Sequence, residues 1–192
     1  MPDTISPSPS HSLLSASAWV RRWSHLVPPS GNVLDVACGA GRHMQWFAAR
    51  GLTAIGVDRS PEAVEAARQF GEVISADIEN GPWPFAGRRF DAVVVTNYLW
   101  RPLFPYLLDS VAPGGVLIYE TFAIGNESVG RPARPEFLLQ PGELLTLCPG
   151  LRVIAYEDGY LPEPARFVQR IVARRETSPS TEVFRAQLCA PV

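Results

Sequence analysis

The sequence predicts an α/β fold, with a mostly parallel sheet that ends in an antiparallel hairpin and with helices on both faces. Two observations predict this class. Short apolar runs alternate with helical stretches from residue 32 to residue 121, which is typical of parallel strands joined by crossover helices. Two further strand-like runs then follow with too few residues between them for a crossover helix, so they are expected to pair in antiparallel fashion.

The N-terminal part is expected to hold a tail and one helix. Residues 1–12 are rich in Ser and Pro and predict a disordered tail, and residues 13–29 predict a helix that Pro28 stops. Trp19 and Trp23 on this helix fit either packing on the core or a cap over a ligand site. The elements that follow are expected as strands at 32–37, 53–57, 72–76, 90–96 and 115–120, with helices at 42–50, at 61–70 and before 111.

The C-terminal part breaks this alternation. Residues 122–142 hold several Gly and Pro and predict a long loop, which we interpret as a substrate loop because long loops in compact domains are usually functional. The closing strands are expected at 151–157 and 166–174. A single domain is therefore predicted over 13–174, with a polar C-terminal tail at 175–192.

Composition and charge exclude several classes of function. The 192 residues carry a formal net charge of −2, which disfavours the strongly basic surface of a nucleic-acid-binding protein. No apolar run reaches the ~18 residues that a membrane span needs, and the N-terminus lacks the pattern of a secretory signal. The three cysteines lie far apart, which predicts reduced thiols in a cytoplasmic protein and no metal site.

The strongest local motif is a buried strand that runs into a Gly-x-Gly turn and then a helix, from Val33 to His43. Such a turn lets the backbone approach a ligand, whose polar part meets the N–H groups that begin the helix. Met44 occupies the position where a dinucleotide fingerprint has a third small residue, which disfavours a pyrophosphate. Asp35, just before the turn, is placed to accept hydrogen bonds within the turn or from a cationic amine.

Acidic residues stand at the ends of the next two strands. Asp58 is placed to accept from both hydroxyls of a ribose, and Asp77 from the amine of an adenine. One such Asp alone is more often a helix cap or a turn former. Three acidic residues at three successive strand ends instead indicate a nucleoside site without a phosphate.

With these motifs the sequence resembles the class I S-adenosylmethionine-dependent methyltransferases, from about residue 26 to residue 174. The glycine turn, the Asp58 and Asp77 strand ends and the Gly115 region follow in the family's order. Within the family it is most similar to the small-molecule branch that includes tellurite-resistance-type enzymes. Ala37 departs from the family's usual Gly, and its methyl group is expected to crowd the cofactor.

The resemblance implies a Rossmann-like sheet of seven strands whose last strand is antiparallel, in a bacterial cytoplasmic enzyme. It also implies S-adenosyl-L-methionine as the cofactor and S-adenosyl-L-homocysteine as the product. The cofactor-binding residues that it implies are Asp35, Ala37, Gly39, Gly41, His43, Asp58, Arg59, Asp77, Ile78 and Asn97.

The acceptor is expected to be a small molecule with a thiol, a metalloid oxyanion or a hydroxyl as its nucleophile. Correct placement is enough for a soft nucleophile, whereas a hydroxyl needs a base. The catalytic candidates are Tyr98, Arg101 and Glu120, and Arg101 suits an anionic acceptor. We expect no membrane partner and a monomer or a homodimer. A nucleic-acid acceptor is disfavoured, although tRNA stays open as a substrate.

Two other functions stay open at this point. A protein that binds S-adenosylmethionine or another protein without catalysis is compatible with the same residues, since methyl transfer requires no fixed catalytic side chain. An NAD-dependent oxidoreductase is a weaker alternative, because Met44, Asp77 and the antiparallel hairpin disfavour it.

Overall fold

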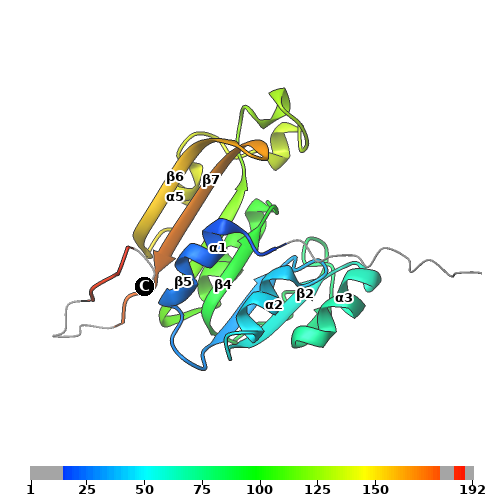
Figure 1. Ribbon diagram of the computed structural model, residues 1–192, viewed down its shortest axis with the longest axis vertical. Helices are drawn as coiled ribbons and strands as arrows, with labels where there is room; N and C mark the ends of the chain where they lie inside the picture. Colours follow the sequence, from blue (N-terminus) through cyan, green and yellow to red (C-terminus); the bar gives the residue numbers. More distant parts are fainter. Residues whose placement is uncertain (1–14, 178–183, 189–192) are drawn as a thin grey trace, which may run out of the picture.

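The computed structural model describes residues 15–177 and 184–188 (Figure 1). Its seven strands form one sheet in the order β3-β2-β1-β4-β5-β7-β6. Strands β1 to β5 pair in parallel, and β7 runs antiparallel to both β5 and β6. The predicted fold class is therefore confirmed. The expected tail at 1–12 and much of the one at 175–192 lie outside the described residues.

The strands and helices lie close to their expected positions. The strands are β1 (Asn32–Val36), β2 (Thr53–Asp58), β3 (Glu72–Ser75), β4 (Phe90–Thr96), β5 (Val111–Phe122), β6 (Arg152–Pro162) and β7 (Ala165–Arg174). The α-helices are α1 (Ala18–Trp23), α2 (Arg42–Ala48), α3 (Pro61–Ala67), α4 (Phe104–Asp109) and α5 (Glu143–Leu147). Single 3₁₀ turns are η1 (Ser24–Leu26), η2 (Arg68–Phe70), η3 (Arg101–Leu103), η4 (Asn126–Ser128) and η5 (Pro135–Phe137). Within the described part of the chain, no helix has the length and apolar character to cross a membrane.

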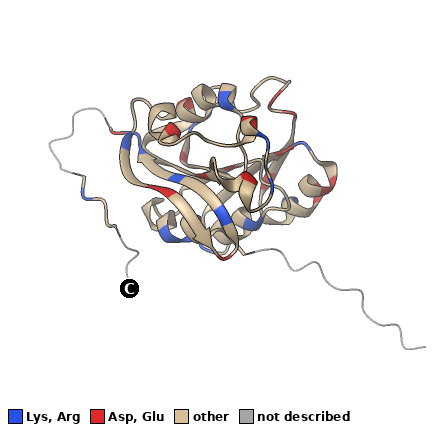
Figure 2. Cartoon of the chain, turned by 90° about the horizontal axis from the view of Figure 1, so that it is seen from above, with Lys and Arg blue, Asp and Glu red and all other residues tan. Residues whose placement is uncertain are grey.

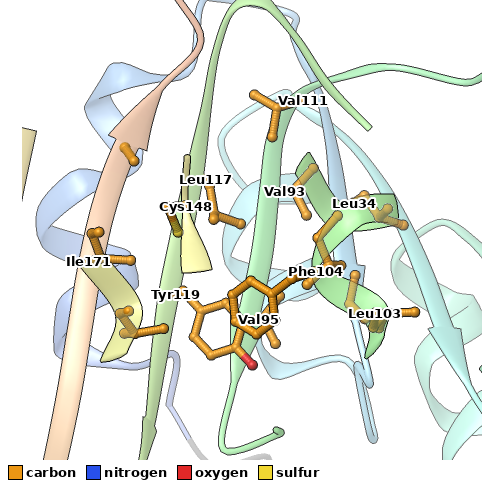
Figure 3. Close-up of a cluster of buried hydrophobic side chains, with 14 of the residues drawn as sticks. Leu34, Val93, Val95, Leu103, Phe104, Val111, Leu117, Tyr119, Cys148 and Ile171 are labelled. Carbon is orange, nitrogen blue, oxygen red and sulfur yellow. The ribbon is translucent and has the colours of Figure 1, made fainter. Parts of the chain in front are cut away.

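The central strands are buried on both faces, which explains their continuous apolar runs. Val93 and Val95 of β4 point to one face, where they pack with Phe104 of α4 and Leu144 of α5. Figure 3 shows this cluster, in which Tyr119 of β5 lies beside Phe104. The alternate residues of β4 point to the other face, which α1 and α2 cover. Helices on both faces are thus required to bury the sheet.

The closing hairpin is longer than expected. β6 continues to Pro162 rather than ending at Glu157, because it stays paired with β7 up to a turn at residues 163–164. β5 likewise reaches Phe122, since its second half pairs with β7. The chain then passes directly from the end of β5 into the long loop at 122–142.

Helix α1 resolves the alternative between core packing and a cap. Trp19 and Trp23 are each 1% exposed and pack on the sheet, as a core helix does. The N-terminal end of α1 reaches the carboxyl edge of the sheet. There the Ser17 hydroxyl donates to Glu120 Oε1 over 2.9 Å, and the Ser17 N–H donates to His43 Nε2 over 3.3 Å. In the described structure, α1 is therefore a core helix that is anchored at its N-cap.

Charged residues are spread along the described chain. Figure 2 shows basic and acidic positions interspersed on the strands, helices and loops. Several of them are paired at the surface, including Arg88 with Glu72 and Arg68 with Glu65. The arrangement agrees with the near-neutral composition of the sequence.

Candidate functional site

A cavity of about 360 Å³ opens at the carboxyl ends of β3, β2, β1, β4 and β5. Chain order reverses between β1 and β4, and open α/β sheets bind their ligands at such a switch point. The volume lies within the ~300–1,000 Å³ of typical small-molecule sites. The cavity is lined by Ala37, Asp58, Arg59, Ala76, Asp77, Ile78, Glu79, Asn97, Tyr98, Leu99, Thr121, Phe122, Pro132 and Phe137.

The glycine turn forms the part of the site between β1 and α2. Gly39 and Gly41 have φ of +54° and +83°, which favour glycine. A Cβ on Gly41 would lie 2.9 Å from Cβ of Ala67, so this glycine lets α2 pack closely on α3. A Cβ on Gly39 would meet no atom within 4 Å, so this glycine faces open space. Ala37 has a φ of +53° and carries a methyl group in the same left-handed region.

Asp58 joins the end of β2 to the glycine turn. Its Oδ2 accepts from the Gly39 N–H over 2.8 Å, and its Oδ1 accepts from the Ser60 N–H over 2.9 Å. A carboxylate has about four acceptor positions, so further donors in the cavity can still reach both oxygens. Asp58 therefore holds the glycine turn by hydrogen bonds and also lines the cavity.

Asp77 forms a compact turn after β3. Its carboxylate accepts from the Asn80 side chain over 2.9 Å and from the N–H of Glu79 over 3.0 Å. The Asn80 amide and then the Glu79 N–H lower the pKa of Asp77, so the side chain is an ionised acceptor at neutral pH. The turn also brings Ile78 to the cavity wall.

The segment after β4 forms the centre of the cavity wall. Asn97 has a φ of +55°, and its N–H donates to the Glu120 carbonyl over 2.9 Å. The carbonyl of Tyr98 accepts from the Tyr119 hydroxyl over 2.7 Å. The Tyr98 hydroxyl is buried and has no hydrogen-bond partner among the described residues. Burial, and next the Glu79 carboxylate, raise the pKa of Tyr98, so it is a neutral phenol at physiological pH.

Residues 33–115 match the family model described as a methyltransferase domain, and this stretch contains the glycine turn, Asp58, Asp77 and Asn97. The sheet order and the antiparallel β7 extend the same architecture to residue 174. Over residues 33–115 the chain is therefore similar to methyltransferase domains, and its fold is that of class I methyltransferases.

Curated relatives support this assignment over part of their length. The ribosomal protein L11 methyltransferase of Burkholderia vietnamiensis is 41% identical over 96 residues, which are 46% of this chain and 31% of that protein. The L11 methyltransferase of Burkholderia lata is 39% identical over 94 residues, again 31% of its length. The match thus spans about a third of the length of these relatives. The substrate that their names give, ribosomal protein L11, is a property of those proteins.

Solved structures show the fold of the methyltransferase domain. TehB from Haemophilus influenzae has a TM-score of 0.65 at 17% identity, over 80% of this chain and 60% of that one. A S-adenosylmethionine-dependent methyltransferase from Methanosarcina mazei has a TM-score of 0.66 at 14% identity, over 86% and 100%. The cyclase SpnF also matches, with a TM-score of 0.64 at 15% identity. The fold alone therefore leaves the reaction and its acceptor undecided.

The methyltransferase domain implies S-adenosylmethionine as the cofactor, and the cavity fits it. Carboxylates from Asp58, Asp77 and Glu79 line the cavity with a single guanidinium, that of Arg59. These acceptor groups suit a ligand that donates from hydroxyl and amine groups or carries a positive charge. It does not suit a polyphosphate, which needs several N–H or cationic donors.

Asp35 and His43 lie beneath the cavity and not on its wall. Both are 2% exposed, and His43 Nδ1 lies 3.7 Å from Asp35 Oδ2. His43 Nε2 accepts from the Ser17 N–H, so the ring proton of the neutral imidazole is on Nδ1, toward Asp35. The contacts of His43 therefore connect the glycine turn to the N-cap of α1.

Glu120 is likewise a buried link. It is 1% exposed, accepts from Ser17, and pairs with Arg170 over 3.3 Å and with Arg166 over 3.6 Å. From the sequence, Glu120 was expected to be a catalytic candidate. In the structure it joins β5, β7 and the start of α1, and it is absent from the cavity wall.

Arg101 was expected to hold an anionic acceptor, and it instead holds a carboxylate of the chain itself. Its Nε and Nη2 donate to Glu143 over 2.6 and 2.9 Å. Its remaining bonds go to the carbonyls of Glu136 over 2.8 Å and of Leu138 over 2.9 Å. Arg101 thereby ties η3 to the loop at 122–142 and to α5, and it does not line the cavity.

The structure thus brings together part of the residue set expected from the sequence. The expected residues on the cavity wall are Ala37, Asp58, Arg59, Asp77, Ile78, Asn97 and Tyr98. Expected residues that do not line the cavity are Asp35, Gly39, Gly41, His43, Arg101 and Glu120. The lining residues that the sequence did not indicate are Ala76, Glu79, Leu99, Thr121, Phe122, Pro132 and Phe137, although three of them lie in the loop at 122–142 that the sequence singled out.

Proposed function

We propose that this protein binds S-adenosylmethionine at the carboxyl edge of its sheet and transfers the methyl group to a small-molecule nucleophile. One observation carries the proposal: carboxylates from two neighbouring strand ends, Asp58 and Asp77, face one cavity beside the glycine turn of a methyltransferase domain. That arrangement supports a nucleoside ligand that carries no phosphate.

Named residues take the following roles in this proposal. Asp58 accepts from the ribose hydroxyls, and Asp77 accepts from the adenine amine. Ile78, which follows β3, and Leu99, which follows β4, provide apolar contacts for the adenine base. Gly39 leaves space for the amino-acid part above the turn, where a side chain would intrude.

The chain contributes placement more than acid–base chemistry. When bound, the cofactor supplies a methyl group that its sulfonium already activates. Of the candidate bases expected from the sequence, Glu120 is bonded to Ser17 and Arg170 away from the cavity wall, and Tyr98, on the wall, is a neutral phenol. Orienting two reactants can supply up to ~7–11 kcal/mol of a barrier without a base. We therefore favour a soft nucleophile such as a thiol, which is mostly neutral at pH 7 when it binds and needs little help from a base to react.

Thermal unfolding with S-adenosylhomocysteine tests cofactor binding, with NADH as the control. A ligand at ~100 times its Kd stabilises the native state by about 2.7 kcal/mol. Each kcal/mol shifts the Tm of a domain of this size by ~2–4 °C, so an increase of roughly 5–10 °C is expected. No shift with saturating S-adenosylhomocysteine, or an equal shift with NADH, would refute the assignment.

Turnover separates the enzyme from a protein that only binds. Wild-type protein with S-adenosylmethionine and a panel of thiols, phenols and metalloid oxyanions is expected to form S-adenosylhomocysteine faster than the cofactor alone. Binding without acceptor-dependent product across the panel would favour the non-catalytic alternative.

A further inference from the structure

We propose that the methyl acceptor is an uncharged molecule with a flat apolar part, held at the β5 end of the cavity against Phe122, Pro132 and Phe137. This inference rests on the proposed function and narrows its acceptor class. It disfavours metalloid oxyanions and other small anions, which the sequence had left open.

The cavity has two ends of different chemistry. It runs across the ends of β3, β2, β1, β4 and β5, and four strand spacings correspond to about 19 Å. Its charged lining residues are Asp58, Arg59, Asp77 and Glu79, which follow β2 and β3. The lining at the β5 end consists of Thr121, Phe122, Pro132 and Phe137, none of which ionises. The nucleoside therefore matches one end and an apolar group matches the other.

Three cations of the elements around the apolar end, Arg101, Arg134 and Arg170, are already paired within the chain. Arg101 bonds both oxygens of Glu143 and two backbone carbonyls. Arg134 pairs with Glu136 at the surface, and Arg170 pairs with Glu120 and Glu157. An anion at the β5 end would lose its hydration without gaining a cation from the cavity wall, and such desolvation is strongly unfavourable.

The apolar wall is also held in place before any ligand binds. Arg101 donates to the carbonyls of Glu136 and Leu138, the two residues that flank Phe137. Leu138 is fully buried, whereas Phe137 remains 41% exposed at the cavity. The backbone on both sides of Phe137 is thus held, and the Arg134 guanidinium lies 5.3 Å from the centroid of its ring. The part of the ring that lines the cavity suits stacking against a planar apolar group. Pre-organisation of this kind lowers the entropy lost when a ligand binds.

Calorimetric titration of the protein saturated with S-adenosylhomocysteine tests this inference. The probes are indole, which is flat and neutral, benzoate, which is flat and anionic, and tellurite, which is a small oxyanion. We expect indole to bind about tenfold more tightly than either anion. Tighter binding of benzoate or tellurite would overturn the inference, and so would the absence of binding by all three probes.

Two variants locate the binding of indole. Phe137→Ala is expected to weaken indole binding about fivefold or more, with the Kd of S-adenosylhomocysteine changed less than twofold. Tyr106→Ala removes an aromatic ring that is 51% exposed on α4, away from the cavity wall, and should change neither value. Unchanged indole binding in Phe137→Ala would overturn the proposed location. Failure of S-adenosylhomocysteine itself to bind would instead refute the proposed function.

Discussion

Replacing Ala37 by Gly should stabilise this protein, although it deletes a methyl group. Ala37 has a φ of +53°, where an L side chain costs about 1–2 kcal/mol. Glycine adopts this region freely but loses about 0.5–1 kcal/mol more backbone entropy on folding. The difference predicts a net stabilisation of about 0.5–1 kcal/mol, or a Tm increase of ~1–4 °C for a domain of this size.

Ala40 provides a matched control in the same turn. It is exposed and is not among the residues with positive φ, so Ala40→Gly relieves no strain and should lower stability by up to about 1 kcal/mol. Thermal and urea unfolding of both variants measures the two effects. If Ala37→Gly is no more stable than the wild type, or matches Ala40→Gly, the reasoning from backbone strain is wrong. Because Ala37 lines the cavity, removal of its methyl group in Ala37→Gly should also tighten binding of S-adenosylhomocysteine.

Three further perturbations test the site and its support. Asp58→Ala should lose most affinity for S-adenosylhomocysteine while keeping a cooperative unfolding transition; wild-type affinity by calorimetry would contradict its role. Arg101→Gln should free the loop at 122–142 and raise the acceptor KM about tenfold with cofactor Kd unchanged, whereas Arg68→Gln, which removes an exposed pair with Glu65 away from the cavity wall, should have little effect. An equal effect of both variants would refute a specific positioning role. The hydrogen bond from Arg101 lowers the pKa of Glu143 below its usual value of 4.5. The ion pair therefore contributes its full stabilisation above pH 4.5, and this contribution is lost as the pH falls through the lowered pKa of Glu143. The difference in unfolding free energy between wild type and Glu143→Gln should therefore shrink between pH 6 and pH 3, and a constant difference would argue against this linkage.

Several features of the site follow from local sequence. The strand, Gly-x-Gly turn and helix at 33–43 are encoded by neighbouring residues, because backbone conformation there depends on glycine and on short-range bonds. Asp58 and Asp77 were expected near each other because each ends a strand, and the carboxyl ends of parallel strands share one edge. The alternation of apolar runs likewise predicted the order of strands and helices.

Other features depend on contacts between residues that are far apart in the chain. Ser17 meets Glu120, 103 residues later, and this contact places the start of α1 at the edge of the sheet. Arg101 meets Glu143, 42 residues later, and becomes a support of the loop in place of a contact for an anion. No local pattern encodes these partners, since they depend on how helices and loops pack after the sheet has formed.

The sequence by itself determined the α/β class, the antiparallel hairpin and the carboxylates at the β2 and β3 ends of the cavity, because periodicity, glycine turns and strand ends are local properties. Only the tertiary structure decided which polar residues reach the cavity and which are buried beneath it. It also brought Phe122 and Phe137 together at the β5 end and neutralised Arg101 with Glu143. The reason is physical: the charge that an acceptor meets depends on which side chains remain unpaired after long-range packing.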